Sequence, residues 1–362
     1  MGFTCNFAVI ICSVKKLLKN ITNWEAWPFK ILYTPMAIFW LWYIIKSKSV
    51  WFFTPSNPKL TFGGLEGEPK KEMYDLLPKE LYPPTFTVLP NADFNIIKQK
   101  LSLNNIDYPI IVKPEVGGQG ILLRKINDEA ALQQYHAMMP WEYIVQQLVT
   151  YPMEVSVFYI RHPKKSRGTV TGFLHKIPLQ VTGNGVDTLE TLVEQHAKGS
   201  KLLMTLQLKH AERWNEVIPF NEKYMLSYAA NHNRGAQFIN LAEDIDDTLV
   251  VLFDGISSTG NEFYYGRYDI MCSSVKDLKA GKNFSILEYN GCGAEPNHFY
   301  DTGYTLLGAY KEILLHWKAL FEISKYNSSI GIKPWSFKKG KKFLLNSRNL
   351  TVAMKAIDLK MA

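Results

Sequence analysis

The sequence predicts an α+β fold with two strand-rich lobes that meet near residue 147. Two observations carry this prediction. Short apolar runs with β-branched and aromatic residues alternate with amphipathic helical stretches along residues 85–326. The chain also has 362 residues, of which 47% are hydrophobic, enough for the cores of about two to three domains. We find no internal repeat.

The charge and the cysteines limit the class of protein. Lys and Arg number 41 against 33 Asp and Glu, so the formal net charge is +8. A basic surface suits nucleic acid, an anionic membrane or a phosphate-bearing ligand. The chain has no run of five Lys or Arg and no zinc-finger spacing, so we expect no nucleic-acid partner. Four cysteines make no disulfide framework and favour reduced thiols in the cytoplasm.

Residues 1–55 form a hydrophobic N-terminal segment that differs from the rest. Fifteen uncharged residues run from Ile31 to Ile45, with Lys30 before them and Lys46 after them. This run is short for a transmembrane helix, which needs about 20 residues. Tryptophans, which favour the headgroup region, crowd the same stretch. A spanning helix, an interfacial helix and a helix packed on the body remain open, and residues 24–53 are the expected membrane contact.

The elements of the body follow in order. A Pro- and Gly-rich stretch, 54–69, predicts a linker or loop at the start of the first lobe, 56–146. The expected strands are 85–89, 108–114, 120–126, 143–149, 153–160, 169–181, 263–272 and 284–290. The expected helices are 91–101, 127–139, 187–197 and 304–326. The second lobe spans 147–330, and the basic tail, 331–362, predicts a solvated or membrane-facing helix.

The segment IIVKPEVGGQG predicts a phosphate-binding turn. Lys113 ends a strand, and Gly117, Gly118 and Gly120 follow it. A turn rich in glycine can direct its N–H groups inward around phosphate oxygens, and a lysine adds a positive charge. An ordinary glycine-rich hairpin is the alternative. Neither a P-loop nor a strand–GxGxxG–helix unit is present.

The segment between the lobes predicts a nucleoside contact. Gln147 precedes Glu154 by seven residues. Backbone groups where the lobes join can meet an adenine edge, and a carboxylate a few residues later can bind the ribose hydroxyls. A buried ion pair of Glu154 is the alternative, because a buried charge requires a partner.

The segment SILEYNGCG predicts a metal site. Side chains at i and i+2 on a strand share one face, so Glu288 and Asn290 point together, as do Arg267 and Asp269. Neighbouring strands would gather Asp269, Glu288 and Asn290 as oxygen ligands for Mg²⁺, with Arg267 beside them to stabilise developing charge. An Arg–carboxylate network across the sheet is the alternative.

These motifs, in the order VKPEVGGQG, QQLVTYPMEVSV, GRYDI and LEYNGCG, resemble the ATP-grasp superfamily over about residues 65–325. Within it the chain is similar to the D-alanine:D-alanine ligase and cyanophycin synthetase group, to which the segment VTGNGVDTLETLV also points. The resemblance implies an ATP-grasp fold, in which two α+β lobes grip ATP. The chain departs from the pattern of that family in its N-terminal substrate domain, which is shortened.

The resemblance also implies roles for individual residues. The implied ATP contacts are Lys113, Glu115, Gly117, Gly118, Gln119, Gly120, Gln147, Leu148, Val149 and Glu154. Asp269, Glu288 and Asn290 would bind two Mg²⁺ ions, which Mn²⁺ could replace, and Arg267 and Lys113 would be catalytic. Lys70 or Lys71 would be a further phosphate-binding lysine. The implied substrate contacts are Asn233, Arg234, Gly293 and His298, for which a surface turn or a structural role is the alternative.

The implied activity is an ATP-dependent carboxylate–amine ligase that works through an acyl phosphate and releases ADP and phosphate. Its partners would be a small-molecule carboxylate and an amine. A non-catalytic, membrane-associated ATP-binding sensor or scaffold is the alternative. We expect a cytoplasmic protein, either free or attached to the inner face of the membrane.

Overall fold

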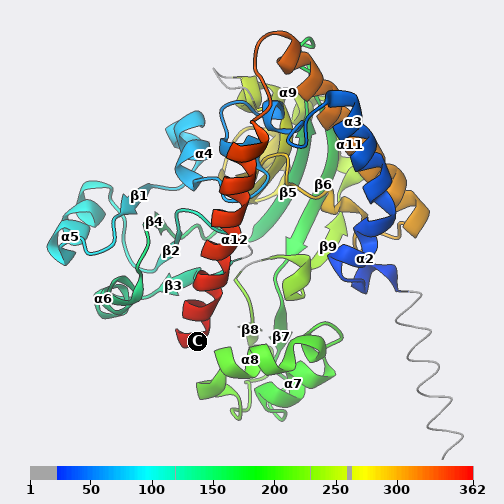
Figure 1. The fold of residues 1–362 in the computed structure, drawn as a ribbon. Helices are drawn as coiled ribbons and strands as arrows, with labels where there is room; N and C mark the ends of the chain where they lie inside the picture. The colour runs from blue at the N-terminus through cyan, green and yellow to red at the C-terminus, as the bar shows by residue number, and fades with distance from the viewer. Residues whose placement is uncertain (1–22, 119, 229, 259–262, 362) are drawn as a thin grey trace, which may run out of the picture.

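Two antiparallel sheets in two lobes form the centre of the protein. The computed structural model describes residues 23–118, 120–228, 230–258 and 263–361 of the chain. One sheet has four strands in the order β1-β4-β2-β3, and the other has five in the order β11-β10-β5-β6-β9. They lie side by side in Figure 1, with helices packed against each. The predicted α+β class is therefore confirmed.

The first sheet is built from residues 85–147. Its strands are β1 (Thr85–Val88), β2 (Ile110–Pro114), β3 (Arg124–Ile126) and β4 (Tyr143–Gln147). Helices α5 (Phe94–Leu103) and α6 (Glu129–Met138) bury their apolar sides with it. The side chains of Asp93 and Asp128 cap these helices by accepting backbone N–H bonds. The strand expected over 120–126 begins only at Arg124, because the N–H of Leu123 bonds back to Gly120 in a turn.

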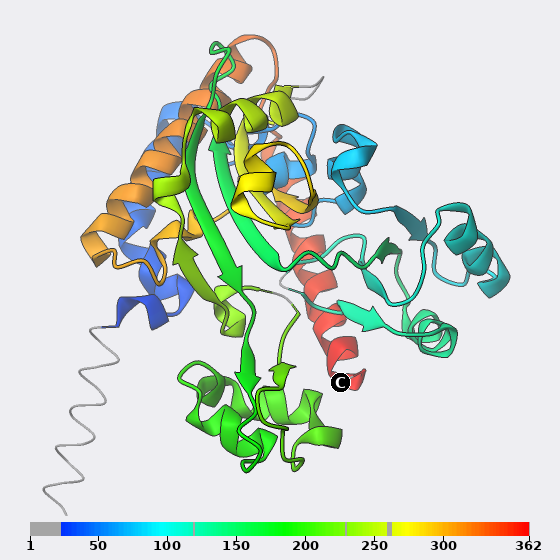
Figure 2. The same ribbon diagram turned by 180° about the vertical axis from the view of Figure 1, so that it is seen from behind.

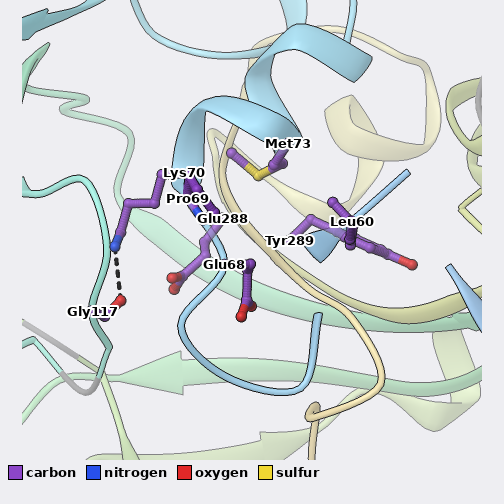
Figure 3. A pocket seen from close by; sticks show the side chains of 8 residues that line it. All are labelled: Leu60, Glu68, Pro69, Lys70, Met73, Gly117, Glu288 and Tyr289. Carbon is purple, nitrogen blue, oxygen red and sulfur yellow. Dashed lines mark hydrogen bonds between the residues drawn. The ribbon is translucent and has the colours of Figure 1, made fainter. Parts of the chain in front are cut away.

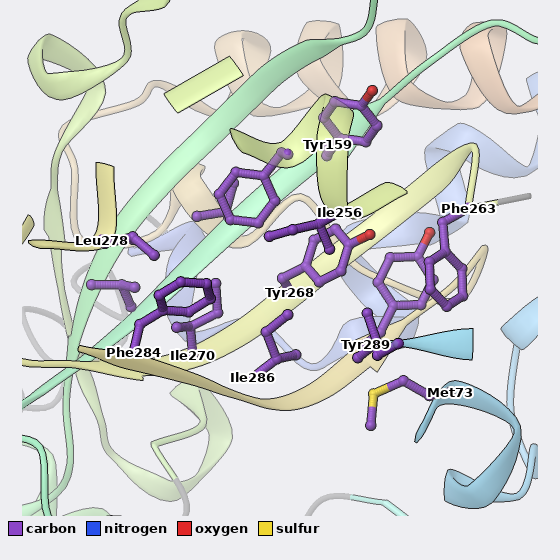
Figure 4. Packing of buried hydrophobic residues seen from close by; sticks show 14 of the residues in the cluster. Met73, Tyr159, Ile256, Phe263, Tyr268, Ile270, Leu278, Phe284, Ile286 and Tyr289 are labelled. Carbon is purple, nitrogen blue, oxygen red and sulfur yellow. The ribbon is translucent and has the colours of Figure 1, made fainter. Parts of the chain in front are cut away.

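The second sheet carries an apolar face and a polar face. Its strands are β5 (Met153–Ile160), β6 (Thr169–Ile177), β9 (Gln237–Asn240), β10 (Tyr265–Cys272) and β11 (Phe284–Asn290). Helices α9 (Asp247–Ser258) and α10 (Val275–Lys279) cover the apolar face. Figure 4 shows Tyr159, Tyr268 and Ile270 in that layer. Because side chains alternate along a strand, the residues between them point to the opposite face.

Residues 179–226 form a small separate lobe. It consists of β7 (Gln180–Thr182), α7 (Leu189–Gln195), α8 (Leu203–Lys209) and β8 (Lys223–Met225), which pack around their own apolar cluster. Figure 2 shows it below the second sheet. The strand predicted over 169–181 is therefore two strands. Pro178 lies between them, where its missing N–H cannot continue a ladder.

The N-terminal segment lies along a long helix of the second lobe. Helices α2 (Phe29–Tyr33) and α3 (Ala37–Ser47) run beside α11 (Leu306–Ser329) (Figure 1). The ring of Trp40 lies 4.8 Å from that of Trp317, and the ring of Tyr43 lies 4.7 Å from that of Phe321. One side of the segment is thus packed on the body. Within the described part of the chain, no helix is both long and apolar enough to cross a bilayer.

Residues 54–69, predicted as a linker or loop, form a loop of turns and short 3-10 helices that is part of the core, so the linker alternative is wrong. Asn57 is fully buried, and its amide donates to the carbonyl of Tyr265 at 2.8 Å and accepts from the N–H of Tyr264 at 3.0 Å. Phe62 is fully buried among aromatic rings. Side-chain hydrogen bonds thus replace regular structure here, and the chain then enters α4 (Lys70–Leu76).

The C-terminal tail is a helix, as predicted, but one of its faces is packed on the body and is neither solvated nor membrane-facing. Helix α12 (Phe337–Lys360) runs across the front of the molecule in Figure 1, from the second lobe to the first. Phe343 packs 5.1 Å from the ring of Phe62, while Met354 is buried in the core of the first sheet. Apolar residues at 343, 350, 354 and 357 share one helical face, and both lobes cover that face.

Candidate active site

The polar face of the second sheet brings the predicted oxygen donors together. In the antiparallel pairing of β10 with β11, Asp269 lies opposite Glu288 and Arg267 lies opposite Asn290. Opposed residues of such a pair have Cα atoms about 4.5–5.5 Å apart and point to the same side. These four side chains therefore lie together on one face, as the alternation of side chains along the two strands predicts.

Asp269 is the centre of this cluster. One oxygen accepts from Nε of Arg267 and the other from its guanidinium NH₂, each at 3.2 Å, and Asn290 donates to the carboxylate at 3.3 Å. Burial alone would raise the pKa of Asp269, but Arg267 and Lys176 lower it to about 2. Asp269 is therefore ionised at neutral pH, the state that a metal ligand requires.

Lys176 completes the cluster, and sequence reasoning did not identify it. Its ammonium lies 2.5 Å from Glu154 and 3.1 Å from Asp269. Burial would lower the pKa of Lys176, but the two carboxylates raise it above its ordinary value. Glu154 is thus in the buried ion pair that was the alternative to a ribose contact. A lone lysine in the apolar strand FLHKI was the available signal.

Two lysines lie near Glu288, at one side of this cluster: Lys113 is buried and Lys70 is half-buried. The ammonium of Lys70 donates to the carbonyls of Pro114 (3.0 Å) and Gly117 (2.8 Å), as Figure 3 shows for Gly117. The ammonium of Lys113 makes long contacts with the Tyr74 hydroxyl (3.3 Å) and the Leu287 carbonyl (3.4 Å). Neither forms an ion pair within 4.0 Å with any residue that the structure describes. Burial lowers the pKa of both.

These contacts favour Lys70 over Lys71 as the further phosphate-binding lysine. The side chain of Lys70 reaches the glycine-rich turn, whereas Lys71 is tied to it by its backbone N–H, which donates to Glu115 at 2.6 Å. Glu115 therefore anchors the start of α4. It does not point its carboxylate at the two ammonium groups closely enough to pair with them.

The space beside Lys70 is small. A cavity of about 20 Å³ lies between α4, the turn and β11, lined by the residues in Figure 3: Leu60, Glu68, Pro69, Lys70, Met73, Gly117, Glu288 and Tyr289. That volume holds a water molecule but no nucleotide. Burial raises the pKa of Glu68 to about 7, with Glu288 adding to the effect. Nucleotide binding would therefore require these side chains to separate.

The glycine-rich turn is covered by α12. Gly117 has φ of +143°, and a Cβ there would lie 3.3 Å from the sulfur of Met354. Gly118 has open space on its Cβ side, and Gly120 follows in a left-handed conformation. Asp358 accepts from the N–H of Leu122 at 3.0 Å and pairs with Arg124 at 2.8 Å. Gln119, also expected to contact ATP, lies outside the described residues.

The expected adenine contacts lie where the two sheets join. Leu148 and Val149 link β4 to β5. The side-chain amide of Gln147 is held by the backbone of Asp107, from which it accepts at 2.9 Å and to which it donates at 3.2 Å. Its neighbour Gln146 points inward instead, donating to the hydroxyl of Tyr74 at 2.8 Å. In this structure the amide of Gln147 is thus engaged within the first lobe.

Arg267 is also held by the segment that follows β11. Its guanidinium donates to the backbone carbonyl of Glu295 at 3.2 Å. The carboxylate of Glu295 accepts from the hydroxyls of Tyr33 (2.8 Å) and Tyr300 (2.9 Å). Burial raises the pKa of Glu295 despite these two donors. No short-range pattern pointed to Glu295, because its partner Tyr33 is 262 residues away.

The four expected substrate contacts do not form one group. Gly293 lies against the backbone of Leu65, where a Cβ would come within 1.9 Å of a carbonyl oxygen, so it allows close packing of two loops. Arg234 lies in the turn His232–Arg234, near Asp358 and Arg124. Asn233 belongs to the same turn, and its side chain lies outside the described part of the chain. His298 is buried behind the cluster against Gly172.

His298 forms a compact group with Glu312 and His316. Nε2 of each imidazole lies 3.1 Å from the same carboxylate oxygen. The two histidines lower the pKa of Glu312 against the effect of burial, so the carboxylate is ionised. Such a set could bind a transition metal, and a shared carboxylate between two imidazoles accounts for the same distances. Either arrangement gives His298 a structural position.

The donors on the polar face fit Mg²⁺. Asp269, Glu288 and Asn290 offer two carboxylates and an amide oxygen from adjacent strands, and Mg²⁺ prefers such hard ligands together with phosphate oxygens. Lys70 and Lys113 fit the phosphates, since one is half-buried and the other buried, and neither has an ionic partner among the described residues. The residues present therefore fit a metal–triphosphate pair.

Comparisons with known proteins find similar structures but no match in sequence. No protein-family model matches the chain, and no curated protein is similar to it in sequence. It is similar to the D-alanine–D-alanine ligase of Bacillus anthracis, with a TM-score of 0.41 and 12% identity over 73% of this chain and 69% of that one. It is also similar to the VanG D-Ala:D-Ser ligase of Enterococcus faecalis, with a TM-score of 0.40 and 11% identity over 70% of this chain and 61% of that one. A bifunctional glutathione synthetase of Pasteurella multocida is similar with a TM-score of 0.36 and 16% identity over 68% of this chain and 35% of that one. The chain thus spans about a third of that protein. The chain is structurally similar to ATP-grasp ligases at low sequence identity.

Proposed function

We propose that this protein is an ATP-dependent ligase that joins a small-molecule carboxylate to an amine through an acyl phosphate, releasing ADP and phosphate. One observation carries the proposal. Lys113 is buried and Lys70 is half-buried, neither has an ionic partner among the described residues, and both lie near Glu288, which is opposite Asp269 in the pairing of β10 with β11. A buried cation is costly without an anion, and a triphosphate would supply one.

In this proposal the lysines and the oxygen donors on β10 and β11 contact different parts of the metal–nucleotide complex. Lys70 and Lys113 would bind phosphate oxygens beside the Gly117 turn, while Asp269, Glu288 and Asn290 would hold one or two Mg²⁺ ions, for which Mn²⁺ can substitute. When bound, the metal neutralises charge on the transferred phosphoryl group. Leu148, Val149 and the turn through Gly118 and Gly120 supply the backbone groups around the nucleotide.

Arg267 acts on the acceptor side. It lies next to Asp269 and is fixed by the carbonyl of Glu295, so its charge is positioned before any substrate arrives. A fixed cation is suited to an oxyanion that forms when an amine attacks an acyl phosphate. Lys176 pairs with Asp269 and Glu154 and holds both carboxylates in place; burial raises the pKa of Glu154, and Lys176 opposes that rise. Arg267 and Lys113 are thus the proposed catalytic residues.

A second function is a non-catalytic ATP-binding sensor or scaffold. The ion-pair network of Asp269 with Arg267 and Lys176 favours it, because that network already satisfies the carboxylate without a metal ion. In either case we place the protein in the cytoplasm, where ATP is available, free or at the inner face of a membrane.

One experiment separates the two. The purified full chain is incubated with ATP, Mg²⁺ and pairs drawn from a panel of amino acids and other carboxylates and amines, and ADP release is measured together with product mass. The ligase proposal expects ADP release that requires both a carboxylate and an amine. ATP binding, measured by calorimetry, without ADP release for any pair would favour the sensor.

A further inference from the structure

Helices α2 and α3 present an unusually apolar surface. Seven large apolar side chains in residues 29–45 are each 43–69% exposed. They are Phe29, Ile31, Ile38, Phe39, Leu41, Trp42 and Ile45. Single exposed apolar residues are normal on a folded protein, but such a group on two successive helices marks an interaction site.

The segment that carries these exposed side chains is packed on the body of the protein. Leu32 and Met36 are buried on the opposite side, in the cluster around α11. Trp40 packs edge-on against Trp317, and Tyr43 stacks on Phe321. The body therefore fixes the orientation of α3, and its apolar outer side stays uncovered by the residues that the structure describes.

The charges around this surface have one sign. Residues 26–65 contain no Asp or Glu, whereas Lys30, Lys46 and Lys48 flank the apolar run. The exposed side of the neighbouring helix α11 carries Lys311, Lys318 and Lys325 against the single acidic residue Glu322. A cationic rim around an apolar centre that contains Trp42 complements an anionic lipid surface, where tryptophan favours the headgroup layer.

The length of the helix decides how it would lie. Helix α3 has 11 residues and is about 16 Å long, half of the ~30 Å apolar core of a bilayer. It can bury one side in the interface but cannot cross it. We propose that α2 and α3 bind an anionic membrane as an in-plane interfacial anchor, with α11 lysines at the same lipid surface. This anchor does not depend on the ligase activity.

Binding of the full chain to vesicles tests the proposal. Co-sedimentation is measured with phosphatidylcholine vesicles and with an equal mixture of phosphatidylcholine and phosphatidylglycerol. We expect binding to the mixed vesicles, a blue shift of tryptophan emission, and weakening at high salt. Ile38→Glu with Trp42→Glu should weaken binding about tenfold or more, because charges enter the apolar layer. Lys30→Gln with Lys48→Gln should reduce the preference for the anionic lipid.

Val186→Glu with Met204→Glu provides the matched control, since it adds the same two charges at exposed apolar positions of the small lobe. It should bind vesicles like the wild type. The anchor is excluded if the wild type does not sediment with either vesicle, or if the Ile38/Trp42 variant binds unchanged, because residues 1–22 would then suffice. A dimer that Trp42→Glu dissociates, without vesicle binding, would instead assign the surface to a second copy.

Discussion

The hydroxyl of Tyr33 donates to the carboxylate of Glu295 at 2.8 Å, and the backbone of Glu295 in turn accepts from Arg267. The N-terminal segment therefore reaches the arginine of the candidate site through one intervening residue. The ring of Phe29 stacks on that of Tyr33 at 4.2 Å, so the exposed apolar surface and the site share a contact.

Removing the Tyr33 hydroxyl should loosen this contact. In Tyr33→Phe the buried Glu295 loses one of two donors, which should cost about 1–2 kcal/mol in the free energy of unfolding. If Glu295 positions Arg267, the KM for the acceptor should also rise severalfold while that for ATP changes little. Thermal unfolding and ADP-release kinetics measure both. Tyr310→Phe, in the same apolar cluster, is the control. An unchanged acceptor KM would limit Tyr33 to a structural role.

The oxygen donors should be needed for turnover. Asp269→Asn and Glu288→Gln each remove a negative charge from the sheet edge and should lower ADP release by about 100-fold or more, with a higher Mg²⁺ requirement in whatever activity remains. Circular dichroism checks the fold, and Glu322→Gln on the exposed side of α11 is the charge-matched control. Wild-type-like ADP release in both variants would falsify the metal assignment.

Lys70 and Lys71 should differ, although they are neighbours. Lys70→Met removes the ammonium at the Gly117 turn, and ATP binding should weaken about tenfold or more. Lys71→Met keeps its backbone bond to Glu115 and should bind ATP like the wild type. Calorimetry with ATP and Mg²⁺ measures both affinities. Equal effects of the two substitutions would contradict the assignment of the phosphate site to Lys70.

Glu68 should make stability depend on pH. Its pKa rises from about 4.5 to about 7 on folding. Between these values the folded chain holds a proton that the unfolded chain has released, so this contribution is fully present below pH 4.5 and is lost as pH rises through about 7. The wild type should therefore lose about 1–3 kcal/mol relative to Glu68→Gln between pH 4.5 and 7.

Thermal or urea unfolding at several pH values provides the measurement for Glu68. Glu66→Gln, two residues earlier, controls for the loss of an acidic group in this turn. A constant difference between wild type and Glu68→Gln across the range would show that Glu68 titrates normally.

Asp358 should hold the C-terminal helix on the first lobe. Asp358→Asn breaks the pair with Arg124 and weakens the bond to the N–H of Leu122, next to the glycine-rich turn. We expect about 1–2 kcal/mol lower stability, and faster hydrogen exchange in residues 117–124. Asp247→Asn, which affects the exposed pair with Arg167, should change exchange there little. Exchange in 117–124 that does not change would exclude this role of α12.

The sequence alone determined the strands and the side chains that share a face. Alternation along 265–272 and 284–290 was enough to group Arg267, Asp269, Glu288 and Asn290, because the side-chain period of a strand is fixed locally. The same local rules predicted the α+β class and placed Lys113 before a glycine-rich turn. The helical period of α12 was also visible in the sequence. Which parts of the protein would cover its apolar face was not visible there.

Only the tertiary structure decided which distant groups meet. Lys176 pairs with Glu154 because β5 and β6 align in register, and Lys70 rather than Lys71 reaches the turn because of how α4 packs on it. Tyr33 with Glu295, and Asp358 with Arg124, join segments more than two hundred residues apart. Such contacts depend on the packing of the whole chain, so no short-range pattern in the sequence encodes them.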